Sequence, residues 1–131
     1  MPQSQVFGTS NQYIKYRINV NVNSQSIENN TSNVTVTVFF YRTNRGYTTY
    51  GSGTCRCGIN GESYSQSVSP NQKITSSGIT LFSKTLDISH DNDGSKSIWV
   101  SAMISMNTPL SSADQGFYAA LPTIPCAAVH I

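Results

Sequence analysis

Strict alternation of apolar and polar residues is the feature that most constrains how this chain can fold. Between residues 13 and 23, one row of alternate positions is apolar: Ile14, Tyr16, Ile18, Val20 and Val22. A second segment, residues 34–41, repeats the pattern with Val34, Val36, Val38 and Phe40. Successive side chains of a strand point to opposite faces, so a two-residue period predicts half-buried β-strands. No segment shows the 3.6-residue period of an amphipathic helix.

The composition agrees with this interpretation. Val, Ile and Thr number 33, whereas Leu, Ala, Glu and Lys number 16. The first group favours strands and the second favours helices. A chain of 131 residues is one domain's worth. About seven short antiparallel strands in one domain predict an all-β, two-sheet antiparallel β-sandwich, immunoglobulin-like or jelly-roll-like. We expect an N-terminal extension at 1–12, the single sandwich domain at 13–125 and a C-terminal tail at 126–131.

Two turns have recognisable chemistry. Asn60-Gly61 predicts a type I′ hairpin, because that turn needs positive φ at both central residues. A two-residue loop would pair Ile59 with Glu62 and place the row of Cys55, Cys57 and Ile59 inward. Farther along, residues 92–94 are expected to close a three-residue loop with Gly94 in the left-handed region.

The apolar rows on either side of this second loop predict its length. Leu86 and Ile88 would lie beside Val100 and Ile98 in a hairpin, which turns Trp99 outward, opposite Asp87. His90 would end the inward row and bond to the loop backbone as a structural residue. The run Asp91-Asn92-Asp93-Gly94 is explained by turn formation, because a calcium loop would need a Glu where Ala102 stands.

Several classes of function are disfavoured. The net charge is +2 without a basic cluster, so no nucleic-acid partner is expected. No apolar run is long enough for membrane insertion, and the N-terminus lacks the pattern of a signal peptide. Cys55, Cys57 and Cys126 are an odd set with poor metal-ligand spacing, and we expect free thiols. Catalytic motifs are missing, so we expect no enzyme activity, no metal and no cofactor.

Aromatic residues are the best candidates for a ligand-binding role. Tyr41, Tyr47 and Tyr50 gather around a Gly-rich segment, and Trp99 is expected to point away from the core. Outward aromatic rings among Ser and Asn side chains can stack on sugar rings or form a subunit contact. Ordinary packing beneath a loop is the alternative, and the sequence leaves all three open.

Four short motifs occur in a characteristic order. They are NNTSNVTVTV at 29–38, TYGSGTCRCGING at 49–61, ISHDNDGSKSIWVSA at 88–102 and LPTIP at 121–125. This order resembles an uncharacterised family of siphophage and prophage tail-associated structural proteins, over roughly residues 14–125. The chain departs from the family pattern at Cys126, where a basic residue is usual. The resemblance implies a virion component with a β-sandwich and no assigned catalytic residues.

The leading hypothesis is therefore a non-enzymatic module of a phage tail tip, baseplate or fibre that adheres to the host by binding surface carbohydrate. The alternative is a purely architectural spacer or assembly domain, and a cell-wall hydrolase is disfavoured. The expected partners are other virion proteins and a host cell-surface glycan, and a homo-oligomer stays open. The expected location is the virion, assembled in the bacterial cytoplasm.

Overall fold

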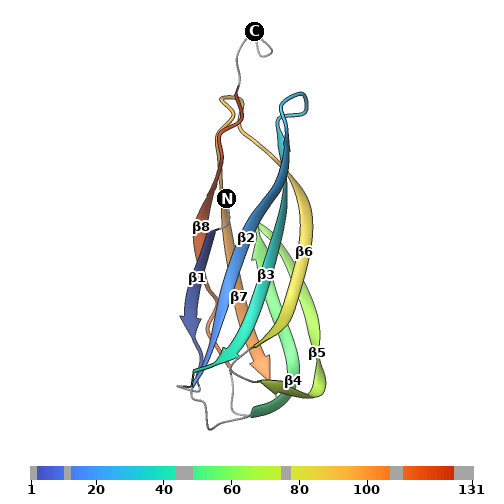
Figure 1. Cartoon of the computed structure of the whole chain (residues 1–131), viewed down its shortest axis with the longest axis vertical. Helices are drawn as coiled ribbons and strands as arrows, with labels where there is room; N and C mark the ends of the chain where they lie inside the picture. The colour runs from blue at the N-terminus through green and yellow to red at the C-terminus, as the bar shows by residue number, and fades with distance from the viewer. Residues whose placement is uncertain (1–2, 11–12, 44–48, 75–77, 107–110, 126–131) are drawn as a thin grey trace.

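The chain folds into two layers of long antiparallel strands with the core between them (Figure 1). The computed structural model describes residues 3–10, 13–43, 49–74, 78–106 and 111–125. The strands are β1 (Gln3–Gly8), β2 (Ile14–Ser26), β3 (Thr31–Arg42), β4 (Thr49–Ile59), β5 (Glu62–Ile74), β6 (Ile79–Ser89), β7 (Lys96–Met106) and β8 (Gln115–Leu121). The described part of the chain contains no helix, and the predicted β-sandwich is confirmed.

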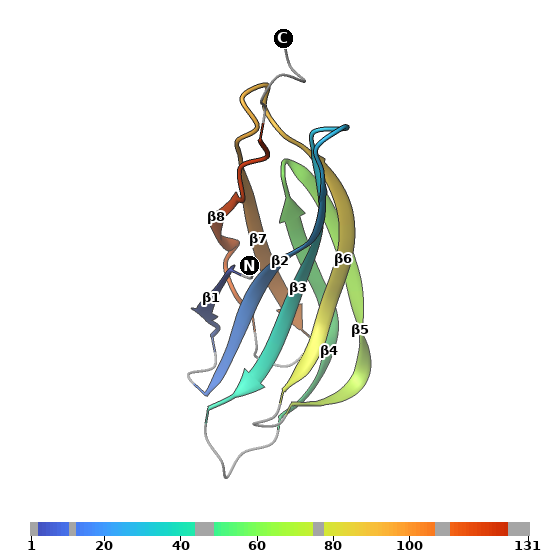
Figure 2. The ribbon, with the colours of Figure 1, turned by 45° about the horizontal axis from the view of Figure 1, so that its top comes forward.

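Each layer contains four strands. One sheet has the order β1-β2-β3-β6 and the other the order β5-β4-β7-β8, with every neighbouring pair antiparallel. Figure 2 shows the two sheets facing each other along the length of the molecule. The strand order differs from the ABED and CFG sheets of an immunoglobulin constant domain.

The alternating rows form the core as predicted. In β3, buried and half-buried residues alternate along the whole strand, and the row from Val34 to Phe40 is buried. The row from Ile14 to Val20 in β2 is also buried. The opposing sheet contributes Cys55, Cys57, Ile59, Ile98, Val100, Ala102, Ile104, Ala119 and Leu121. Two sheets that each present one apolar face exclude water by packing those faces together.

The sandwich is closed differently along its two sides. On the β1 and β8 side, the Gln3 amide exchanges hydrogen bonds with the backbone of Ala120, and Gln115 Nε2 donates to Gly8 O at 3.0 Å. On the β5 and β6 side, the rings of Tyr64 and Phe82 lie 6.5 Å apart. Hydrogen bonds on one side and an aromatic contact on the other connect the two layers.

The N-terminal boundary differs from the expected one. Strand β1 lies within the segment expected to be an extension, and it pairs with β2 from Gln3↔Val20 to Gly8↔Lys15. The sequence signal is weak because β1 is an edge strand with few buried side chains, and Val6 is 44% exposed. At the other end Ile124 is fully buried, and the expected tail lies outside the described residues.

The β4–β5 hairpin has the predicted register. Ile59 pairs with Glu62 and Cys57 with Tyr64. The turn residues Asn60 and Gly61 have φ values of 51° and 87°, as a type I′ turn requires.

The expected hairpin between residues 79–90 and 98–104 is wrong. Strand β6 pairs with β3, whereas β7 pairs with β4 and β8, so the connecting loop carries the chain from one sheet to the other. Trp99 therefore faces Tyr118 rather than Asp87. Both arrangements bury Ile88 and Ile98, which is why the apolar rows did not distinguish them. Gly94 does adopt positive φ, at 85°.

Candidate functional site

Three of the four sequence motifs meet at one end of the sandwich. In Figure 1 this is the upper end, where the β2–β3 turn, the β6–β7 loop and the segment after β8 come together. The His90 N–H donates to Asn30 O at 2.9 Å, and the Ile124 N–H donates to Gly94 O at 2.9 Å. We call Asn30, Ser32, His90, Gly94 and Ile124 the His90 network.

His90 is the centre of this network. Its Nδ1 lies 2.7 Å from Gly94 O, and its Nε2 lies 2.6 Å from Ser32 Oγ. A carbonyl oxygen only accepts, so Nδ1 donates its hydrogen to Gly94 O, and the Ser32 hydroxyl, which accepts from Gln25 Nε2 at 3.0 Å, can donate its own hydrogen to Nε2. Both ring nitrogens of this buried side chain are therefore occupied within the fold. The predicted structural role of His90 is confirmed.

The acidic run beside His90 forms a turn, as predicted. Asp93 Oδ1 accepts from the Ser95 hydroxyl at 2.6 Å and from the Ser95 N–H at 3.0 Å. Both bonds lower the pKa of the Asp93 carboxyl below its usual value, and the bond from the Ser95 hydroxyl has the larger effect. No group of three or more His, Cys, Asp or Glu side chains within the described ranges could hold a metal ion.

The structure does not bring the four candidate aromatic residues together. Trp99 lies on β7 and Tyr41 on β3, so they belong to different sheets. Tyr41 is half-buried, and the Arg17 guanidinium lies 5.6 Å from the centre of its ring. Tyr50 is part of β4, but its side chain lies outside the described residues, as does the whole of Tyr47.

Trp99 has an aromatic partner that the sequence did not single out. Its ring lies 5.0 Å from that of Tyr118 in an edge-to-face arrangement, and the two residues pair across β7 and β8. Trp99 is 41% exposed and Tyr118 is 70% exposed. The only sequence signal for Tyr118 was its place between Phe117 and Ala119 in a short strand, because its partner depends on the pairing of β8 with β7.

A row of small residues crosses the outer face of the same sheet beside this aromatic pair. Ser63, Gly58, Ser101 and Gly116 are successive partners from β5 through β4 and β7 to β8. A Cβ atom on Gly58 would lie 2.8 Å from Ser101 Oγ, and one on Gly116 would lie 2.1 Å from Val100 O. Larger side chains at these two glycines would therefore clash with β7, and the row forms a shallow floor.

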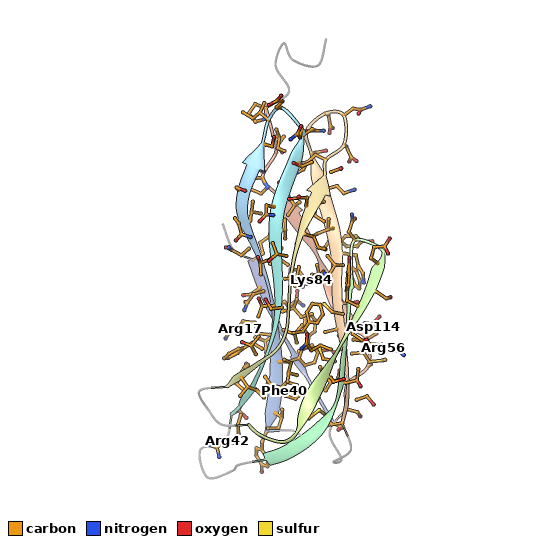
Figure 3. The ribbon with its side chains drawn as sticks, turned by 90° about the vertical axis from the view of Figure 1, so that its right-hand side faces the viewer. Arg17, Phe40, Arg42, Arg56, Lys84 and Asp114 are labelled. Atoms are coloured by element: carbon orange, nitrogen blue, oxygen red, sulfur yellow. The ribbon has the colours of Figure 1, made fainter. Side chains whose placement is uncertain are left out.

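Three residues of this floor, Ser63, Gly58 and Ser101, line a groove of about 320 Å³, which we call the Trp99 groove. It is lined by Arg56, Cys57, Gly58, Gly61, Glu62, Ser63, Trp99, Ser101, Met103 and Asp114. Trp99 and the hairpin tip stand on one side of the floor, and Arg56 and Met103 stand on the other. Figure 3 shows Arg56 and Asp114 on the outer side of the sandwich, away from Phe40 in the core.

The groove combines an apolar ring with solvated polar groups. Arg56, Glu62 and Asp114 are exposed, and among the described residues their side chains form no hydrogen bond or ion pair. The thiols of Cys55 and Cys57, on β4, are free and buried, and burial raises the pKa of each to about 12. Such thiols stay protonated near neutral pH and are poor nucleophiles. Cys126 lies outside the described residues.

Comparison with known proteins adds one finding to this geometry. Residues 7–126 match the model of a family described as siphovirus protein of unknown function (DUF859). The chain belongs to this family. The match covers nearly all of the sandwich and confirms the resemblance drawn from the motifs. No match was found among curated proteins or among solved structures.

Both polar regions of the chain are built from the motifs that resemble this siphovirus family. Three of the family-like motifs build the His90 network, which holds the end of the sandwich together. The remaining motif, at 49–61, supplies Arg56, Gly58 and Gly61 to the Trp99 groove. No helix in the described ranges is long and apolar enough to cross a membrane.

Proposed function

We propose that this siphovirus protein is a non-enzymatic virion component that binds host-surface carbohydrate in the Trp99 groove. The exposed Trp99–Tyr118 pair beside a floor of Gly and Ser residues is the observation that carries the proposal. Other virion proteins are the remaining partners that this role implies, and the virion is the location.

The chemistry of a sugar fits the groove. A pyranose ring has an apolar C–H face, which an aromatic ring can cover, and a rim of hydroxyl groups. Around Trp99 the groove offers the exposed hydroxyl of Ser63, carboxylates at Glu62 and Asp114, and the guanidinium of Arg56, whereas Ser101 in its floor is buried. A volume of about 320 Å³ is at the lower end of the range for small-molecule sites. The sheet beneath is fixed by backbone pairing on both sides of β4 and β7, so the groove is preformed.

The same groove does not suit catalysis. Enzymes exclude water around the reacting atoms, and their nucleophiles are activated by a neighbouring base. Here the carboxylates of Glu62, on β5, and of Asp114, just before β8, are exposed, and burial raises the pKa of the Cys57 thiol to about 12. We therefore propose binding without chemistry.

Binding of the host's purified cell-wall polysaccharide to the purified chain tests the proposal. We expect Trp99→Ala to weaken binding by about tenfold or more, which corresponds to about 1.4 kcal/mol. Tyr118→Ala, which removes the ring packed against Trp99, should weaken binding by a smaller factor. The melting temperature should change little, because both side chains are exposed. Tyr41→Ala, on the other sheet, is the matched control and should bind like the wild type.

Two outcomes would reject carbohydrate binding in this groove. One is the absence of binding by the wild type, and the other is unchanged binding by Trp99→Ala. Either result favours the architectural alternative, in which the exposed aromatic pair contacts another virion subunit, since Trp and Tyr are enriched at protein interfaces.

A further inference from the structure

A second hollow lies next to the Trp99 groove on the same sheet face. It has a volume of about 270 Å³ and is lined by Thr54, Arg56, Met103 and Ser105. Arg56 and Met103 also line the Trp99 groove, so the two hollows are neighbours that share one boundary.

Strand register places the hollows in line. Gly58 pairs with Ser101, Arg56 with Met103, and Thr54 with Ser105. These pairs are successive on the outer face, because the intervening residues Cys55, Cys57, Ala102 and Ile104 are buried in the core. From Ser101 to Ser105 the strand advances four residues, or about 13 Å at the usual rise of about 3.3 Å per residue. The two hollows therefore extend along β4 and β7 over more than one sugar ring.

We infer that the groove takes the interior of a linear polysaccharide that runs along β4 and β7, rather than a single terminal sugar. This inference rests on the proposed function. Trp99 covers one sugar ring, the ridge of Arg56 and Met103 lies under the next part of the chain, and the hydroxyls of Thr54 and Ser105 face a further ring. Among the described residues, the lining of the second hollow includes no carboxylate, so beyond Arg56 these residues offer hydroxyl and thioether groups to a neutral sugar.

An extended peptide is a poorer occupant of the same line. Peptides that lie along a sheet are held by main-chain hydrogen bonds to an unpaired edge strand. Strands β4 and β7 are interior strands, each paired on both sides, so their backbone groups are already used. Recognition here depends on side chains projecting from the sheet face, and these are mostly hydroxyl-bearing or charged.

Binding of size-fractionated fragments of the host cell-wall polysaccharide, from the monosaccharide to the hexasaccharide, tests the inference. We expect affinity to rise by about tenfold or more between the monosaccharide and the tetrasaccharide and then to level off. Ser105→Tyr should fill the second hollow, remove most of the gain for long fragments and leave monosaccharide binding unchanged. Ser83→Tyr places the same side chain on exposed β6 of the other sheet, and it should behave like the wild type.

The outcomes separate this inference from the proposed function. Equal affinity for all fragment lengths, or long-fragment binding that Ser105→Tyr does not change, would overturn the extended groove and leave carbohydrate binding intact. No binding of any fragment by the wild type would overturn both.

Discussion

The His90 network and the Trp99 groove are both rich in polar groups, but they use them in opposite ways. In the network, the His90 ring bonds to the Ser32 hydroxyl and to the Gly94 carbonyl inside the fold. Among the network's side chains, all of which lie in the described ranges, only Asn30 has a buried polar atom, Oδ1, without a hydrogen-bond partner. In the groove, the side chains of Arg56 and Asp114 face solvent without protein partners among the described residues.

This difference separates a structural motif from a binding surface. Polar groups that are already paired gain little from a ligand, because a new bond would replace an existing one. Solvated groups beside an exposed aromatic ring can exchange water for a ligand and bury apolar area at the same time. The more conspicuous motif, with His and three acidic or amide residues in sequence, is therefore the structural one.

The largest expected effect on stability is at His90. Replacing it with Ala removes a buried side chain together with its bonds to the Ser32 hydroxyl and the Gly94 carbonyl, which keep only their bonds to Gln25 Nε2 and to the Ile124 N–H. We expect the free energy of unfolding to fall by about 2 kcal/mol. Asp91→Ala, at an exposed neighbour, is the matched control. Urea denaturation measures both variants. If their midpoints shift equally, the His90 network does not stabilise the fold as described.

The hairpin tip beside the groove should respond less strongly. Gly61 has a φ of 87°, and a β-branched residue there should cost about 1–2 kcal/mol. Arg56 is exposed, so its truncation should change stability by no more than about 0.5 kcal/mol. We therefore expect Gly61→Val to lower the urea midpoint by clearly more than Arg56→Ala. Similar midpoints for the two variants would contradict the type I′ turn.

The smallest expected effect is at Asp93, where a substitution should change how stability depends on pH. Its bonds to Ser95 favour the ionised carboxylate, so the folded pKa lies below the unfolded value of about 3.9. Ionised Asp93 thus adds stability above that value, and the contribution is lost as the pH falls through the folded pKa. Melting temperatures measured from neutral to acidic pH should fall less steeply for Asp93→Asn than for the wild type. Unchanged steepness would show that the turn bonds do not influence stability.

The sequence predicted local features of the fold better than their arrangement in space. Alternation in β2 and β3 identified the buried rows, and Asn60-Gly61 predicted the register of a whole hairpin. Alternation says which face of a strand is buried but not which sheet contains it. For that reason the apolar rows predict a hairpin closed by residues 92–94, although the segment from Ser89 to Lys96 crosses from one sheet to the other.

The candidate site was predicted only in part, because the sequence does not show which strands are adjacent. Trp99 was expected to point outward, and it does, because its buried neighbours Ile98 and Val100 require it in either arrangement. Its partner Tyr118 and the Gly58–Ser101 floor depend on which strands are adjacent, and sequence spacing alone does not contain that information. Tyr41 lies on the other sheet.

The most direct test of the account is a map of the ligand contact by NMR. Fragments of the host cell-wall polysaccharide would be titrated into the isotope-labelled chain while backbone amide shifts and the Trp99 indole signal are recorded. We predict that the changes concentrate at Gly58, Trp99 and Ser101 and are absent at His90. Changes centred on the His90 network or on the outer face of the β1-β2-β3-β6 sheet, or no changes at all, would contradict the Trp99 groove as the binding site.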